Sequence, residues 1–238
     1  MYLLLVILCC AVFEGYASNV PLAQPCLLGD SECLIKTNTR IALSRIGYGL
    51  PEFGIRSLEP MTLRNITMGA DGFRLVFREM NIAGASRCNI EDIQLNFVHS
   101  TMSVTLECPL EATGTFKMSG SICFFDVNHE GNYIVKTDSI RTTINSKIDT
   151  IYGADGHRYW KLTATDYSYE PLENLHIGLG RLFVGEVTRA SPLYNVVSNN
   201  WWPLVSRVAE PAVSAAVARF HEVLQKFFLR VPLEHLSK

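Results

Sequence analysis

The fold is decided by residues 204–230, Leu204-Val-Ser-Arg-Val-Ala-Glu-Pro-Ala-Val-Ser-Ala-Ala-Val-Ala-Arg-Phe-His-Glu-Val-Leu-Gln-Lys-Phe-Phe-Leu-Arg230. The apolar residues recur at steps of three and four, which is typical of an amphipathic helix. This helix would be about 40 Å long at 1.5 Å per residue, opened by Pro203 and kinked by Pro211. Its polar strip is narrow, so another element must cover the apolar stripe along its whole length.

The chain before this helix supplies that covering element. From Met61 to Ile177 apolar and polar residues alternate at period two, and turn signals separate the runs, which predicts an antiparallel meander with one apolar face. A strongly curved sheet of such strands is large enough to cover the helix. Asp30 and Ser31 are suited to cap a short N-terminal helix from about Cys33 to Ile46. The fold class is therefore α+β, with a long C-terminal helix wrapped by a highly curved antiparallel sheet.

The N-terminus has the pattern of a signal peptide. Residues 2–13 form an uncharged apolar run, and the small residues Gly15 and Ala17 follow it. A run of roughly 12 residues is shorter than the about 20 that span a bilayer and fits a signal-peptide core. We expect cleavage after Ala17, leaving 18–238 as a single domain with no later stretch able to span a membrane. A membrane anchor or a buried N-terminal helix is the alternative.

Composition and motifs exclude several classes of function. The formal net charge is −2, which gives no electrostatic footprint for nucleic acid or an anionic membrane. The sequence contains no Gly-x-Ser-x-Gly elbow, P-loop or HExxH helix, so we expect neither an enzyme nor a cofactor. The six histidines are scattered, and each is interpreted as a surface or hydrogen-bonded side chain.

Cysteine usage supports an oxidising compartment. Of the seven cysteines, five remain once the signal peptide is removed. Cys26 and Cys33 are close enough in sequence to close a small disulfide loop. No CxxC or HxxxH cluster accompanies them, so no metal site is expected. Asn65-Ile66-Thr67 is an N-glycosylation sequon and is consistent with secretion.

A second disulfide is left open between alternatives. Cys108 and Cys123 flank a predicted hairpin turn at Thr113-Gly114, and they are candidates for pairing. Cys88 is an alternative partner for either of them, and one cysteine must remain over.

Several short motifs together resemble the insect takeout and juvenile-hormone-binding protein family. Each is weak alone, but their order and spacing cover essentially the whole mature chain. They are Pro25-Cys26 with Cys33, Gly49-Leu-Pro-Glu-Phe-Gly-Ile55, Leu58-Glu-Pro-Met61, Gly131-Asn-Tyr133, Glu173-Asn-Leu175, Leu193-Tyr-Asn195, Asn199-Asn-Trp201 and Val231-Pro232.

The resemblance implies a lipid-carrier fold, a super-roll related to the lipid-binding TULIP proteins, with an apolar cavity near one end. It implies a small hydrophobic ligand, a juvenile-hormone-like terpenoid or another lipid, carried by a monomer in insect haemolymph or another secretion. Tyr133 corresponds to the family's tyrosine in the Gly-x-Tyr segment, whose hydroxyl could meet an epoxide or carbonyl; otherwise it is an ordinary strand aromatic. The remaining lining candidates, which are equally interpretable as plain core, are Leu34, Ile41, Phe227, Phe228, Leu233 and Leu236.

Two departures from the family pattern limit what the resemblance specifies. Glu59 stands where the family more often has Asp before Pro, and no cysteine follows Cys123 to form a later disulfide. The resemblance therefore predicts the fold but does not name the hormone. A second hypothesis keeps the fold but fills the interior, giving a lipid-surface or protein-interaction module without a transported ligand.

Overall fold

The computed structural model describes residues 26–27, 30–33, 45–70, 72–122, 125–172, 175–179 and 201–236. The predicted signal peptide, residues 1–17, lies outside these ranges, as do Leu34, Ile41 and Cys123. The side chain of Leu236 is also outside the described part of the structure.

One antiparallel sheet dominates the described part of the chain. Its hydrogen-bonded path runs β1-β2-β4-β5-β6, with β3 added to β4 and β7 added to β5. The strands are β1 (Met61–Ala70), β2 (Phe73–Ala83), β3 (Asn89–Asn96), β4 (Thr101–Ile122), β5 (Phe125–Tyr152), β6 (Arg158–Pro171) and β7 (Leu175–Leu179). The meander predicted from the period-two alternation is confirmed.

Two strands are much longer than the sequence indicates. β4 has 22 residues and β5 has 28, and they pair with each other along nearly their whole length. The hairpin turn predicted at Thr113-Gly114 is therefore wrong, because β4 runs straight through it. Such long strands can wrap around a helix, and β2 and β3 share one edge of β4 while β6 and β7 share one edge of β5.

The disulfides follow from this register. Cys26 and Cys33 are bridged, as their spacing predicts. The second bridge joins Cys88 to Cys108, so the candidate pair Cys108–Cys123 is corrected. Because β4 does not turn back, Cys108 lies on the order of 45 Å of strand before its end. β3 instead places Asn89 opposite Glu107, which brings Cys88 beside Cys108.

Glu59, which stands where the family more often has Asp, fixes the segment next to the Cys88–Cys108 disulfide. Both carboxylate oxygens of Glu59 accept the backbone N–H of Gly84, at 2.9 and 3.0 Å, and one accepts the N–H of Ser86 at 3.0 Å. Those residues open the 3-10 turn η3 (Ala85–Arg87), which leads directly into Cys88. Glu59 thus holds the start of β3 in place.

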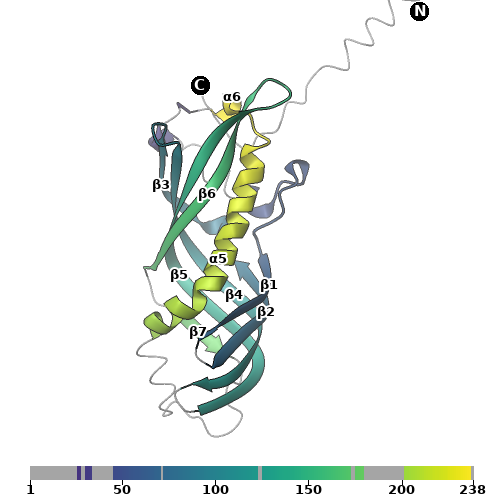
Figure 1. Ribbon diagram of the computed structural model, residues 1–238, viewed down its shortest axis with the longest axis vertical. Coiled ribbons are helices and arrows are strands. Elements are labelled where there is room, and N and C mark those ends of the chain that lie inside the picture. The colour runs from purple at the N-terminus through teal and green to yellow at the C-terminus, as the bar shows by residue number, and fades with distance from the viewer. Residues whose placement is uncertain are drawn as a thin grey trace, which may run out of the picture.

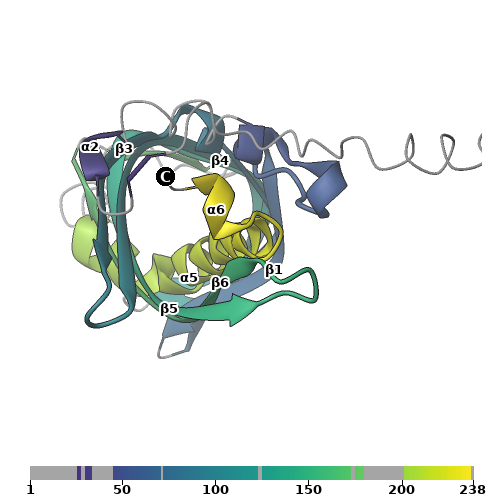
Figure 2. The ribbon, with the colours of Figure 1, turned by 90° about the horizontal axis from the view of Figure 1, so that it is seen from above.

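The long C-terminal helix lies inside the curve of the sheet. It is α5 (Trp201–Phe228), and α6 (Leu233–Leu236) follows it. Figure 1 shows α5 running along the long axis, and Figure 2 shows the strands curving around it with α6 across one end. The helix continues through the exposed Pro211, and Figure 1 shows its first turns leaning away from the rest. The predicted helix and the predicted curved sheet are both confirmed.

Near the N-terminus the described helical pieces are short. They are α2 (Ser31–Cys33), residues 45–48 and the 3-10 turn η2 (Pro51–Phe53). Asp30 caps α2 as predicted, since its Oδ1 accepts the N–H of Cys33 at 2.9 Å. The predicted course of this helix between residues 34 and 44 lies outside the described residues.

Helix α5 packs against β1 and β6, the two ends of the strand path, and so closes the roll between them. The side chain of Gln225 accepts the backbone N–H of Leu162 at 2.7 Å, which satisfies a donor on the free edge of β6. Further along, the Tyr167 hydroxyl donates to Glu210. The apolar stripe of α5 packs inward, with Val223 fully buried. Burying a side chain of this size contributes about 1.5–3 kcal/mol.

Candidate functional site

The inner face of the roll consists of side chains that stand in rows across the sheet. In each row, neighbouring residues are cross-strand partners, so their side chains lie side by side. We name three successive rows after their members on β5. The His129 row is Met68, Leu75, Met118 and His129; the Gly131 row is Ile66, Phe77, Phe116 and Gly131; and the Tyr133 row is Leu63, Met80, Gly114 and Tyr133.

Methionine is concentrated on this face. Five of the six methionines in the sequence are core residues of the sheet, and each is no more than 6% exposed. Methionine is unbranched and polarisable, so it adapts to irregular shapes and suits surfaces that bind varied apolar partners. The five are Met61, Met68, Met80, Met102 and Met118.

Tyr133 lies in the core and reaches across a glycine. Its side chain is 4% exposed, and its hydroxyl donates to the backbone carbonyl of Glu79 at 3.4 Å. Glu79 follows a register shift in β2, and Gly114 lies between the two residues on β4. A β-carbon on Gly114 would meet the Glu79 carbonyl oxygen at 1.9 Å, so only glycine leaves room for this contact.

Two phenylalanines surround Tyr133. The ring centroid of Phe77 is 4.6 Å away and that of Phe116 is 6.4 Å away, both edge to face. Burial in this apolar environment raises the pKa of the Tyr133 hydroxyl well above its usual range. The hydroxyl therefore remains a protonated hydrogen-bond donor. Its bond to Glu79 is longer than the usual O–H···O distance of about 2.7–2.8 Å.

Buried imidazole nitrogens without partners are unexpected features of the described chain. His129 Nε2 and His221 Nε2 are buried, and neither has a hydrogen-bond partner among the described residues. The interpretation of every histidine as exposed or hydrogen-bonded is therefore wrong for these atoms. His129 stands directly opposite Met118, and its ring centroid is 6.0 Å from that of Phe116. His221 lies on α5, where burial lowers its pKa.

The helix-end candidates form a second aromatic group. Phe227 and Phe228 have ring centroids 5.5 Å apart, and Phe228 is 5.5 Å from Trp160 of β6. Phe227 and Leu233 are each 4% exposed. The start of α6 is therefore packed firmly onto the end of α5 and β6.

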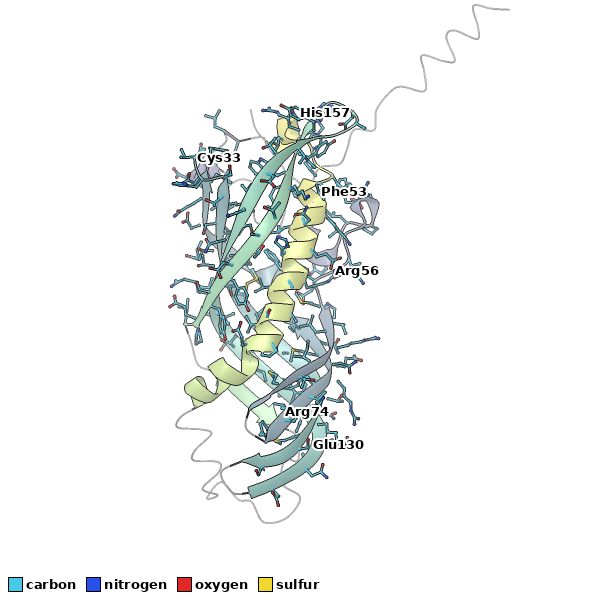
Figure 3. The ribbon with its side chains drawn as sticks, viewed as in Figure 1. Cys33, Phe53, Arg56, Arg74, Glu130 and His157 are labelled. Carbon is cyan, nitrogen blue, oxygen red and sulfur yellow. A yellow bond between two sulfur atoms is a disulfide. The ribbon has the colours of Figure 1, made fainter. Side chains whose placement is uncertain are left out.

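Tyr133 does not meet this helix-end group. Trp160 pairs with Thr150 of β5, and the contour from Tyr133 to Thr150 is on the order of 55 Å. Figure 3 shows the same separation: His157 lies at the α6 end, whereas Glu130, the neighbour of His129, lies at the other end. The predicted site residues thus belong to opposite ends of the interior.

The structure also has a pocket near Glu130, but this pocket lies outside the roll. It has a volume of about 520 Å³ and is lined by polar side chains and one glycine. Lys117 and Ser119 alternate with the core residues Phe116 and Met118, so they belong to the opposite face of β4. The lining residues are Lys117, Ser119, Gly120, Asp126 and Asn128.

Comparison with protein families shows to which family this chain belongs. The sequence model of the haemolymph juvenile hormone binding protein family matches residues 3–238. The chain belongs to this family. It is a family of ligand-binding proteins, and within the described part of this member no helix is sufficiently long and apolar to cross a membrane.

Individual proteins agree with the family assignment. The crystal structure of Epiphyas postvittana Takeout 1 superimposes with a TM-score of 0.83 at 18% identity, covering 91% of this chain and all of that one. At this identity the likeness shows the fold. A putative beta-carotene-binding protein of Schistocerca gregaria is 20% identical over 145 residues. That match covers 60% of this chain and 58% of the locust protein's length.

For this member of the juvenile hormone binding family, sequence reasoning missed His129, Gly114 and the buried methionines. His129 and Tyr133 are four residues apart on a strand of period two, so they share a face. The spacing that places His129 on the same face as Tyr133 was therefore readable from the sequence. Gly114 has no such local signal, because the close approach that requires it comes from β2, over 30 residues earlier in the chain.

Proposed function

We propose that this protein is a secreted carrier that binds one small, predominantly apolar molecule in the interior of the roll. The ligand class is a juvenile-hormone-like terpenoid or another lipid. Binding pockets of this kind are predominantly apolar and contain a few polar groups that fix the ligand's orientation.

The observation that carries the proposal is the methionine-rich inner face. A rigid core of branched side chains packs well only against itself, whereas methionine side chains can repack around a guest. Family membership supports the same conclusion. So does the name of the locust relative, a putative beta-carotene-binding protein, because beta-carotene is a long apolar polyene.

Polar contacts would orient the ligand within the interior. We assign this role to the Tyr133 hydroxyl, which stays protonated and makes only a long bond to Glu79. An epoxide or carbonyl oxygen would be a better-placed acceptor. Phe227, Phe228 and Leu233 lie at the opposite end of the interior, too far from Tyr133 for one small ligand to contact both groups. They would line a separate apolar position. Leu34, Ile41 and Leu236 stay sequence-predicted lining candidates.

Secretion is part of the proposal. It is supported by the signal-peptide pattern of residues 1–17 and by the disulfides Cys26–Cys33 and Cys88–Cys108. Asn65 is exposed on β1, so a glycan there would project into solvent.

Native mass spectrometry of protein secreted by insect cells tests the carrier function. We expect co-purified lipid, or uptake of one added terpenoid or polyene molecule per chain that saturates. A secreted, folded protein that retains no apolar molecule under any loading condition would refute the carrier. It would support the module with a filled interior instead.

A further inference from the structure

We infer that His129 binds the oxygen-bearing end of the ligand, and that this end is a carboxylic acid. The inference rests on the proposed function and names a second polar position in the same interior. His129 projects from the inner face of β5, in a row whose other members are Met68, Leu75 and Met118.

The unsatisfied nitrogen is the observation that needs an explanation. A buried polar atom without a partner costs about 1–3 kcal/mol, and such atoms are rare in native proteins. The other members of the His129 row are apolar, and the centroid of the Phe116 ring lies 6.0 Å from that of His129. Among the described residues nothing satisfies Nε2, and a bound ligand would supply the missing hydrogen bond.

The chemistry of imidazole selects the ligand group. In neutral histidine one ring nitrogen donates and the other accepts, and either tautomer places one of these functions at Nε2. A carboxylic acid carries both an O–H donor and a carbonyl acceptor, so it satisfies either tautomer. If its proton moves to the ring, the product is an imidazolium–carboxylate pair with no net charge, which a buried site tolerates better than one isolated ion. An ester can only accept a hydrogen bond, so it pairs only with the tautomer that carries its proton on Nε2. A hydrocarbon pairs with neither tautomer.

The geometry separates this position from Tyr133. The two residues are four apart on one strand face, with their backbones about 13 Å apart along β5. Gly131 lies between them and offers no side chain, and Phe116 stands opposite it. A ligand headgroup at His129 would therefore have the Phe116 ring beside it and the Tyr133 hydroxyl further along its chain.

The test compares three probes of equal chain length: hexadecanoic acid, methyl hexadecanoate and hexadecane. Each is titrated into the unmodified protein, His129→Phe and His129→Gln by displacement of an apolar fluorophore. In His129→Phe we expect affinity for the acid to fall about five- to a hundredfold, while affinity for hexadecane holds or rises. His129→Gln should recover part of the loss, because its amide both donates and accepts.

Thermal unfolding of the ligand-free variants gives an independent readout. His129→Phe removes the unpaired nitrogen, so its melting temperature should equal or exceed that of the unmodified protein while acid binding weakens. Equal losses for acid and hydrocarbon would show that His129 only packs, and an unchanged affinity for the acid would place the headgroup elsewhere. Either result overturns the inference but leaves the carrier intact. An unmodified protein that binds none of the three probes would count against the proposed function itself.

Discussion

The hydroxyl of Tyr133 passes over Gly114, where a β-carbon would stand 3.2 Å from the hydroxyl oxygen and 1.9 Å from the Glu79 carbonyl oxygen. The second distance is far shorter than any van der Waals contact, and the atom it meets is backbone. Gly114→Ala must therefore separate β2 from β4 locally or displace Tyr133. We expect it to lower the free energy of unfolding by about 3 kcal/mol or more, because overpacking a buried site is among the mechanisms that give large destabilisations.

The matched control is Gly156→Ala in the turn between β5 and β6. Gly156 has φ +82°, and an added β-carbon there meets nothing within 4 Å. Its cost should be backbone strain alone, about 1–2 kcal/mol. Urea unfolding of both variants measures the difference. If Gly114→Ala is no worse than Gly156→Ala, the close approach of Tyr133 and Glu79 over Gly114 does not hold.

Tyr133→Phe should separate packing from ligand orientation. The hydroxyl's bond to Glu79 is 3.4 Å long, so its loss should change the free energy of unfolding by less than about 1 kcal/mol. Affinity for an oxygenated terpenoid should fall about five- to a hundredfold, and affinity for a hydrocarbon of similar size should not change. Titration of both ligands into both proteins measures this. Equal losses for the two ligands would mean that Tyr133 contributes only packing.

Local patterns were sufficient for the elements of this fold. Helix α5 is predictable because its apolar side chains recur at three- and four-residue steps within one continuous stretch of sequence. The strands are predictable for the same reason at period two. Asp30 also caps α2 as its position indicates.

Long-range register could not be predicted in the same way. Glycine commonly marks a turn, so Thr113-Gly114 suggests one, yet Gly114 serves a close approach within a continuous strand. The choice of Cys88 rather than Cys123 as the partner of Cys108 depends on where β3 pairs with β4. The separation of Tyr133 from Phe228 depends likewise on how long β5 remains unbroken. Each depends on residues that are far apart in the sequence.

The disulfide connectivity predicts both a peptide map and a stability difference. Non-reducing mapping of the secreted protein should find Cys26–Cys33 and Cys88–Cys108. Removing the second bridge by a Cys88→Ala, Cys108→Ala double change should cost about 3 kcal/mol, because it closes the longer loop, and removing the first should cost about 2 kcal/mol. A peptide linking Cys108 to Cys123 would contradict the register of β3 and β4.

Glu222 on α5 predicts an acid-dependent contribution to stability. Hydrogen bonds from Lys226 and Arg219 lower its pKa from 4.5 to about 2. The folded-state pKa lies below the unfolded one, so this stabilisation is present above pH 4.5 and is lost as pH falls toward 2. The side chain is 38% exposed, so solvent screening limits the contribution to about 1 kcal/mol or less.

Unfolding of Glu222→Gln and the unmodified protein at pH 7 and pH 2.5 measures this contribution. The variant should be less stable at pH 7, and the two proteins should converge at pH 2.5. Arg56 also approaches Glu222, at 3.6 Å, and Figure 3 shows it beside α5. Equal stability of the two proteins at pH 7 would show that the carboxylate makes no net contribution.

The central claim is that the apolar ligand binds on the inner face of the roll, and two adjacent residues of β4 test it most directly. Ala112 packs against the core, whereas the side chain of Thr113 points to the other face of the strand. Ala112→Phe places a ring in the interior, and Thr113→Phe places the same ring outside.

Circular dichroism and unfolding measurements check that both variants fold. In fluorophore-displacement titrations with a sesquiterpenoid ester, Ala112→Phe should weaken binding about tenfold or more, and Thr113→Phe should bind as the unmodified protein does. Unchanged binding by Ala112→Phe, or an equal loss in both variants, would contradict an interior site.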